Sequence, residues 1–422
     1  MASLNKINDL KLNTIMLYLL TFSNYFFALA TIPYLTRILQ PELYGLIGFA
    51  MAIMVYFQLI IDFGFMLSAT QRVAENYSDC YKLRKITTSV LGAKVVLSVI
   101  SLITLVVIDL WFDIFSGENV LFGLFFLNTV FSSLIPDYLY RGLEKMRLIT
   151  IRTVAVKALF TVLIYVFLQE PSQYCLVPLF YLFGSIAATL WSYIDIYKRF
   201  NIYFIRITVN EIFDEIKISF PFFVSRIATT IYGASNIMML KYIYPTNMEI
   251  GYYTSSDKIV SIARSASSPI ADSLYPYMVK NRDYKLMFKI LLWIMPLVLI
   301  GCIFLFVYAV PICMIIFGEQ YAETGHILRY MIPLMVIVLP NYVFGFPALV
   351  PLGLARIANL SNVIGAVIQI IGLCFLFFND LADVYNVCIL TSITEGAVLL
   401  IRITATMYGI KRNKTIPSRI SN

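Results

Sequence analysis

Long apolar segments recur from one end of this chain to the other, and they constrain the fold more than any other feature. About 20 consecutive apolar residues form a helix that crosses the ~30 Å hydrocarbon layer of a bilayer. The chain has 422 residues, of which 60% are hydrophobic and only 13% are charged. Soluble domains carry roughly 25% charged residues. We therefore expect an all-α polytopic membrane protein with nothing large outside the bilayer.

The apolar segments predict about twelve spans joined by short loops. The first begins near Leu12 and exceeds the roughly 7–15 apolar residues of a signal peptide, and no small-residue cleavage site follows it, so we expect it to be retained. The loops leave no room for a soluble catalytic domain. The expected spans are 12–35, 43–66, 86–108, 119–140, 149–168, 176–197, 216–240, 250–278, 288–316, 327–352, 358–378 and 384–408.

Charge predicts the orientation, because Lys and Arg residues are retained on the cytoplasmic side of a membrane. With the N-terminus inside, most basic residues fall in inner segments, for example Arg84 and Arg147. The outer segments then keep only Arg37, Lys241 and Arg329, and their other charges are acidic. We therefore expect both termini in the cytoplasm. The net charge of +8 follows from the same rule and requires no nucleic-acid partner.

The longest inner connection lies near the middle of the chain and divides the spans into two halves of about six, a common plan in transporters. A faint echo relates the halves: Pro41-Glu42 with Gly45 after the first span, and Glu249 with Gly251 after the seventh. The expected parts are an N-terminal six-helix lobe (1–197), a cytoplasmic linker (198–215), a C-terminal six-helix lobe (216–410) and a basic cytoplasmic tail (411–422).

Motifs of catalysis are missing from the sequence. Walker A spacing is absent. The one histidine, His326, falls in an outer loop, and the six cysteines have neither metal-ligand nor disulfide spacing. Asp62-Phe63-Gly64 spells the kinase magnesium motif, but it ends an apolar span and the other kinase signatures are lacking. We predict no catalytic residues, no metal and no cofactor, hence a protein that is not an enzyme.

The eighth span carries the most informative pattern, because its polar residues recur at steps of three and four and so share one helical face. Such a stripe cannot face lipid, where nothing would satisfy it. It must line water or another polar surface. The stripe consists of Thr254, Asp257, Ser261, Arg264, Ser265, Ser268 and Asp272.

The seventh span repeats this theme with Ser219, Arg226, Thr229, Gly233 and Asn236, and the first does so more mildly with Thr14, Tyr18, Thr21 and Tyr25. The alternative is that the small and hydroxyl residues merely pack helices together. Arginine needs an anion or water, and its planar fork suits phosphate. The pattern therefore favours a phosphorylated or carboxylated cargo.

Ionisable residues inside spans are functional candidates, since they are costly there unless they face a cavity or a partner. Lys94 and Arg402 lie near span ends, so we interpret them as structural side chains that extend to the interface. Asp257 is a candidate for proton or sodium coupling; alternatively it only balances Lys258 or Arg264. The substrate-binding candidates are Arg226, Arg264, Lys258, Lys157, Ser261 and Ser268, and the ion-coupling candidates are Asp257, Asp272 and Glu395.

The stretch 33–42 (PYLTRILQPE), continuing to Tyr44-Gly45, is the longest of several that resemble Wzx-type O-antigen flippases. Gln40 stands where a glycine is more usual in that family. Further similarity lies in 61–65 (IDFGF), 68–74, 219–223 (SFPFF) and 251–258. The similarity covers nearly the whole chain in length, span count and charge layout.

The resemblance implies a place in the multidrug/oligosaccharidyl-lipid/polysaccharide exporter superfamily. It implies two six-helix lobes around a central cationic cavity. The implied activity, for lipopolysaccharide biosynthesis, is alternating-access transfer of undecaprenyl-pyrophosphate-linked oligosaccharide repeat units from the cytoplasmic to the periplasmic leaflet of the bacterial inner membrane. The implied partners are this cargo, membrane lipids and the polysaccharide polymerase machinery.

Three other readings stay open at this point. A drug or cation exporter of the same superfamily would favour an acidic cavity. A lipid II flippase would carry more spans and more arginines in the first span. A polysaccharide polymerase or membrane glycosyltransferase would be an enzyme and would show a large outer loop or a cytoplasmic domain.

Overall fold

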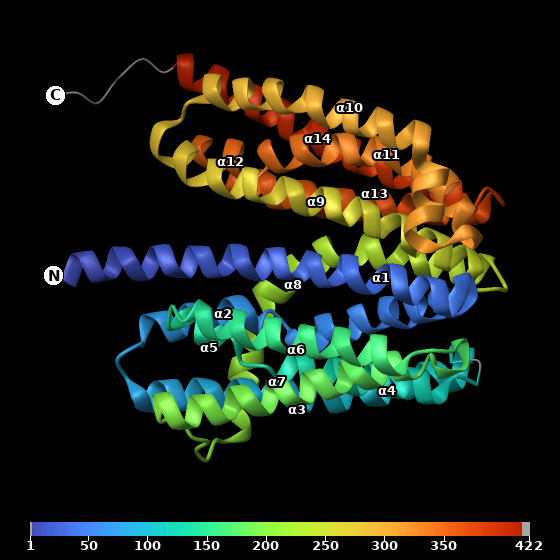
Figure 1. The fold of residues 1–422 in the computed structure, drawn as a ribbon. Helices are drawn as coiled ribbons and strands as arrows, with labels where there is room; N and C mark the ends of the chain where they lie inside the picture. Colours follow the sequence, from blue (N-terminus) through green and yellow to red (C-terminus); the bar gives the residue numbers. More distant parts are fainter. Residues whose placement is uncertain (1, 116, 416–422) are drawn as a thin grey trace. The chain divides into compact units, whose positions relative to one another are not determined.

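The computed structural model describes residues 2–115 and 117–415, and all regular elements in these ranges are helices (Figure 1). The predicted tail 411–422 therefore lies partly outside the described residues. The main helices are α1 (Ala2–Asp62), α2 (Phe65–Glu75), α3 (Cys80–Phe112), α4 (Asn119–Leu134), α5 (Asp137–Gly142), α6 (Met146–Phe167), α7 (Leu176–Phe200), α8 (Val209–Ile243), α9 (Met248–Asn281), α10 (Tyr284–Phe317), α11 (Ala322–Val343), α12 (Phe346–Leu349), α13 (Ala355–Phe378) and α14 (Val384–Thr415).

Helix α1 covers two expected spans, and it is kinked between them at Gln40. The backbone of Gln40 has φ 61° and ψ 169°, which is not helical. Such a conformation is essentially restricted to glycine. The turn therefore persists although glutamine occupies the position at which the related family has glycine.

Two expected spans are each broken into two helices. Span 43–66 is interrupted at Phe63 and Gly64, whose φ angles of 37° and 79° end α1 and start α2. Span 119–140 is interrupted at Ile135 and Pro136, between α4 and α5. Pro136 has no backbone N–H to continue the helical hydrogen bonds of α4. Both spans therefore contain helix ends where a single helix was expected.

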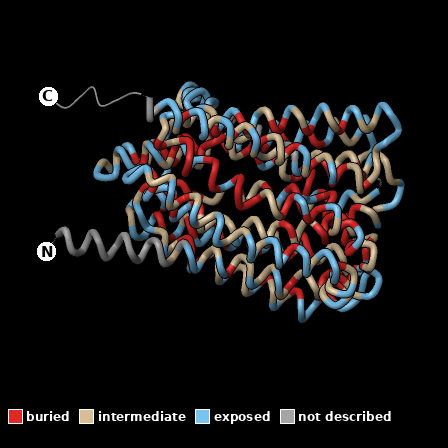
Figure 2. Tube along the Cα trace, turned by 90° about the horizontal axis from the view of Figure 1, so that it is seen from above, coloured by how far each residue is buried: buried red, intermediate tan, exposed pale blue. Residues whose placement is uncertain are grey.

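Nine helical segments of the described chain are long and apolar enough to cross a bilayer. The first of them, Tyr18–Glu75, covers two expected spans. Helices α8 and α9, which carry the polar stripes, are not among the nine, and the count of twelve stays a prediction. Exposed residues run along the helices beside buried ones (Figure 2), and the exposed ones include Trp111 and Trp293. Large apolar side chains on the outside suit a lipid environment.

The chain forms two compact units, which we describe separately. The first unit consists of Met1–Leu39 and Ala50–Thr230, and the second of Gln40–Phe49 and Ile231–Asn422. The short segment 40–49 thus belongs to the second unit, although the chain on both sides of it belongs to the first. The lobes expected at 1–197 and 216–410, with a linker at 198–215, stay a prediction.

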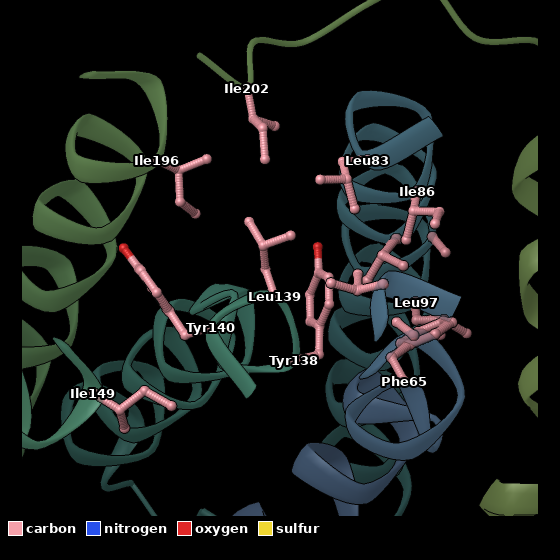
Figure 3. Close-up of a cluster of buried hydrophobic side chains, with 14 residues drawn as sticks. Phe65, Leu83, Ile86, Leu97, Tyr138, Leu139, Tyr140, Ile149, Ile196 and Ile202 are labelled. Carbon is pink, nitrogen blue, oxygen red and sulfur yellow. The ribbon is translucent and has the colours of Figure 1, made fainter. Parts of the chain in front are cut away.

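The core of the first unit lies around the short helix α5. Tyr138 and Leu139 on α5 are buried in one apolar cluster with Phe65 on α2 and Leu83 on α3 (Figure 3). Helices α2 and α5 pack directly against each other. Helices α2 and α5, which follow the two breaks, therefore lie at the centre of this unit rather than at its periphery.

The second unit has a comparable core between α9, α10 and α11. Met278 on α9, Met287 on α10 and Val343 on α11 are fully buried there. Helix α11 is the central element of this unit, since it packs on α9, α10 and α14. Its expected span, 327–352, also ends early, because the chain turns at Phe344 and Gly345 before α12.

Candidate functional site

The polar stripe expected on the eighth span lies on one continuous helix, α9. Its members have different surroundings along the helix. Thr254 is buried, the side chains of Asp257 and Arg264 are 39% and 33% exposed, and Asp272 is exposed. The stripe therefore runs from a buried end to an accessible end within the second unit.

The serines of the stripe are engaged within α9 itself. Ser261 Oγ donates to the carbonyl of Lys258 (2.8 Å), and Ser268 Oγ donates to Asp272 Oδ2 (3.0 Å). Ser261 thus donates to the preceding turn and Ser268 to the following turn, so both hydroxyls are satisfied within the helix. The oxygen lone pairs stay available to accept hydrogen bonds. A role of Ser261 and Ser268 in substrate binding stays a prediction.

Asp257 and Arg264 approach each other across two turns of α9. The closest atoms, Asp257 Oδ1 and Arg264 Nη1, are 3.9 Å apart. Tyr253 and Cys388 also lie close enough to interact electrostatically with the Asp257 carboxylate. The long side chains thus bridge a distance that is too great for the backbone positions alone.

Arg226 lies on α8, in the half of that helix that belongs to the first unit. This half is fastened to its unit by Ser219, which hydrogen-bonds Ser68 (2.7 Å), and by Glu215, which pairs with Arg72. Arg264 belongs to the second unit. The convergence of the two arginines on one cargo stays a prediction.

Lys94 is an enclosed cation of the first unit, with its side chain only 5% exposed. Its Nζ pairs with Asp62 Oδ1 (3.3 Å) and donates to the carbonyl of Ser133. Asp62 is the last residue of α1, and Ser133 lies in the last turn of α4. The carbonyl ends of helices carry partial negative charge. The ammonium thus stabilises both helix breaks at once.

Arg152 makes a second enclosed pair in the same unit. Its Nη2 is 2.6 Å from Asp137 Oδ1, and its Nη1 donates to Ser192 Oγ (2.8 Å). The arginine is 4% exposed. Position 152 falls within the expected span 149–168, and its enclosed ion pair was not predicted, because Asp137 comes into position only through the break before α5.

Lys157 on α6 and Lys258 on α9 differ from these cations. Both are partly buried. Among the described residues, neither ammonium has a carboxylate within pairing distance. An unpaired cation in a span is expensive and marks a functional candidate. Of the basic candidates inferred from sequence, these two stand out after folding.

Arg402 and Glu395 take part in a network inside the second unit. Arg402 donates to Ser361 Oγ (2.9 Å), to the carbonyl of Asn341 (2.7 Å) and to Asn362 Oδ1 (2.7 Å). Asn341 Nδ2 in turn donates to Glu395 Oε2 (2.6 Å). The network joins α11, α13 and α14, so it holds these helices together. A coupling role for Glu395 stays a prediction.

The interpretation that Lys94 and Arg402 extend to the membrane interface is wrong. Lys94 is 4% and Arg402 8% exposed. Both meet polar partners inside their units instead, and for Lys94 the helix breaks supply them. These breaks at Phe63–Gly64 and Ile135–Pro136 were not expected from the apolar pattern.

A buried polar cluster in the second unit was only partly anticipated. Asn236 on α8 donates to Tyr253 Oη (2.9 Å) and to Thr391 Oγ1 (2.9 Å), and Gln369 on α13 donates to Asn236 Oδ1 (2.8 Å). Asn236 was expected on the polar face of the seventh span, whereas Gln369 and Thr391 were not predicted. The signal for Gln369 was an amide within an apolar segment. These groups satisfy one another, as buried polar groups must.

The comparisons with known proteins agree with this architecture. The family model described as polysaccharide biosynthesis protein matches residues 10–282. A protein of Shigella dysenteriae described as an O-antigen transporter is 25% identical over 368 residues, which cover 86% of this chain and 91% of the relative.

Solved structures show the same fold at low sequence identity. The lipid II flippase MurJ in its inward closed conformation is 13% identical, with a TM-score of 0.67 and coverage of 97% of this chain and 94% of that chain. An inward-facing multidrug resistance MATE transporter of the MOP superfamily is 14% identical, with a TM-score of 0.66 and coverage of 92% and 96%. The resemblance inferred from the sequence and the all-α membrane fold are thereby confirmed. The family model covers more than half of this chain, so the chain belongs to the family of polysaccharide biosynthesis proteins.

Proposed function

We propose that this protein is a flippase that moves undecaprenyl-pyrophosphate-linked oligosaccharide repeat units from the cytoplasmic to the periplasmic leaflet of the bacterial inner membrane. The work proceeds by alternating access and not by catalysis. Family membership and a relative described as an O-antigen transporter support a polysaccharide-related cargo. The fold supports transport, since its solved neighbours include a lipid II flippase and a multidrug transporter.

The observation that carries the proposal is that each unit contains a partly buried lysine without a carboxylate partner among the described residues. Lys94 and Arg152 are neutralised by aspartates of their own unit. Lys157 and Lys258 have no such partner among the described side chains. A pyrophosphate supplies the negative charge that these ammonium groups lack. Arg226 and Arg264 are further candidate contacts to the pyrophosphate or to an acidic sugar.

The experiment that tests the activity is deletion of the gene in its own host. If the protein is the flippase, single lipid-linked repeat units accumulate on the cytoplasmic face and surface polysaccharide disappears. If it is a polymerase, single units still reach the periplasmic face. Unchanged surface polysaccharide in the deletion strain would contradict both roles.

Alanine variants test the two lysines. We expect Lys157→Ala and Lys258→Ala to reduce surface polysaccharide in the complemented deletion strain, because each removes a charged donor whose hydrogen bond contributes about 1.5–3 kcal/mol. Lys82→Ala is the matched control: Lys82 is exposed, pairs with Asp79 at 3.6 Å and should be dispensable. Normal polysaccharide in both variants at normal protein level would contradict the assignment.

A further inference from the structure

The segment 40–49 holds a special position in the chain. It packs within the second unit, yet residues 1–39 before it and 50–230 after it belong to the first. Any movement between the units must therefore either bend the chain at both ends of this segment or break its packing. The contacts of this segment therefore determine whether it can move away from the rest of the second unit.

The segment packs against the start of α9 through two glycines. A Cβ on Gly45 would overlap the carbonyl oxygen of Asn247, and a Cβ on Gly251 would overlap the carbonyl oxygen of Pro41. Backbone therefore meets backbone at a distance that only glycine permits. These are the stretches whose echo, Pro41 to Gly45 and Glu249 to Gly251, is visible in the sequence.

A small polar cluster fastens the same contact. Glu42 Oε1 accepts hydrogen bonds from the backbone N of Asn247 (2.9 Å) and from its Nδ2 (3.2 Å). Lys241 Nζ donates to Asn247 Oδ1 (2.8 Å) and lies 5.6 Å from the centre of the Phe49 ring. Asn247 is thus bonded on both sides of its amide. All of these bonds are short-range and reversible.

One turn further along α9, the contact includes polar groups that lack hydrogen-bond partners. Gly48 faces Thr254, whose Oγ1 lies 2.8 Å from the position of a Cβ on that glycine. The hydroxyls of Thr254 and its neighbour Ser255 are buried without a hydrogen-bond partner. A hydroxyl held away from water without a partner opposes burial. The contact therefore combines tight packing at glycines with hydroxyl groups that would gain hydrogen bonds to water if they were exposed.

We propose that the contact between residues 41–48 and 247–254 is the closed position of a gate. It is fastened by Glu42, Asn247 and Lys241, and it opens during the transport cycle to expose Thr254 and Ser255 to water. This inference rests on the proposed function only in assuming that the units move. The opening itself can be measured without any cargo.

Thiol labelling measures the opening directly. In a background in which the six native cysteines are replaced by alanine, Thr254→Cys is treated in membranes with the membrane-permeant reagent N-ethylmaleimide. Ala358→Cys is the control, because Ala358 is fully buried in α13 of the same unit. We expect Cys at 254 to react at least tenfold faster than Cys at 358. Equal, slow reaction of both would overturn the gate.

Weakening the fastening should open the gate further. Glu42→Gln removes a charge but keeps the volume, and Gly45→Ala places a Cβ where the closed contact has no space. Both changes should accelerate labelling of Cys at 254 and leave Cys at 358 unchanged. Labelling of Cys at 254 that stays the same in both variants would contradict the assignment of these residues.

Cross-linking ties the gate to transport. Glu42→Cys with Asn247→Cys, joined by a short bifunctional methanethiosulfonate, should stop surface polysaccharide export, and a reductant should restore it. The control pair is Ser256→Cys with Thr324→Cys, since Ser256 Oγ donates to the Thr324 carbonyl (2.9 Å) between α9 and α11 of the same unit. Cross-linking this pair should be harmless. Transport at the normal rate with the 42–247 pair fully cross-linked would overturn the proposal. If labelling shows opening but deletion leaves polysaccharide export intact, the proposed cargo fails and the gate stands.

Discussion

At the residue scale, the cations inside the helices differ in the partners that folding gives them. Lys94 was expected to extend to the membrane interface, and Lys157 and Lys258 were expected to bind substrate. Folding pairs Lys94 with Asp62 and leaves the other two without a carboxylate partner among the residues that the structure describes. Asp62 is far from Lys94 in the sequence, and only the break at Phe63 and Gly64 makes its position a helix end. The sequence therefore showed that these lysines lie within spans, but not which of them has a carboxylate partner.

Lys94→Met tests this division of roles. The change leaves Asp62 and the Ser133 carbonyl without their cation, and breaking a buried ion pair costs about 3–5 kcal/mol. We expect a marked fall in the thermal midpoint of the detergent-solubilised protein. Lys94→Met combined with Asp62→Leu should recover part of it, because no unpaired charge remains. Lys157→Met is the matched control and should leave the midpoint nearly unchanged; an equal loss in both lysine variants would contradict the argument.

At the scale of elements, helix existence was predictable and helix continuity was not. Runs of apolar residues located the helices well, as α3 and α6 illustrate. The interruptions between α1 and α2 and between α4 and α5 were not predicted, because hydropathy does not change across them. Gly64 and Pro136 were visible in the sequence, yet both residue types also occur inside uninterrupted helices, such as Gly92 within α3 and Pro333 within α11. Local backbone chemistry, not hydropathy, decides these points.

The kink of α1 at Gln40 yields a prediction at this scale. A non-glycine residue at φ 61° and ψ 169° carries strain of about 1–3 kcal/mol. Gln40→Gly should remove most of it, so we expect a higher thermal midpoint, and Gln40→Ala should bring no such gain. Gln40 is exposed, so neither change removes a packed side chain. A lower midpoint for the glycine variant would show that the glutamine side chain stabilises the turn.

At the scale of the whole molecule, the membrane orientation that we expect from the charge distribution makes a direct prediction. Cysteines introduced at Asp113 or Asp380 should react with an impermeant thiol reagent added outside spheroplasts, because both positions are expected outside. Cysteines at Arg147 or Asp283 should react only after the cells are permeabilised. Both experiments use the background without native cysteines. The reverse pattern would mean that the N-terminus is outside.

The source of energy is the remaining question at this scale, and Asp257 is the residue on which we expect it to depend. The sequence contains no Walker A motif, so the work must come from an ion gradient or from the gradient of the cargo. Asp257 lies 3.9 Å from Arg264 and is 39% exposed, so water can reach a carboxylate whose charge is balanced by a neighbouring arginine. A proton or sodium ion that binds Asp257 competes with Arg264 for it and releases the arginine for an anionic cargo.

In reconstituted vesicles, Asp257→Asn should therefore allow downhill movement of lipid-linked oligosaccharide but should not respond to an imposed pH or sodium gradient. Asp272→Asn tests the second ion-coupling candidate on the stripe. Because Asp272 is exposed and accepts a hydrogen bond from Ser268, we expect this variant to keep the wild-type response to both gradients. If wild-type transport ignores both gradients, Asp257 serves only to balance Arg264, and the cargo gradient alone drives transport.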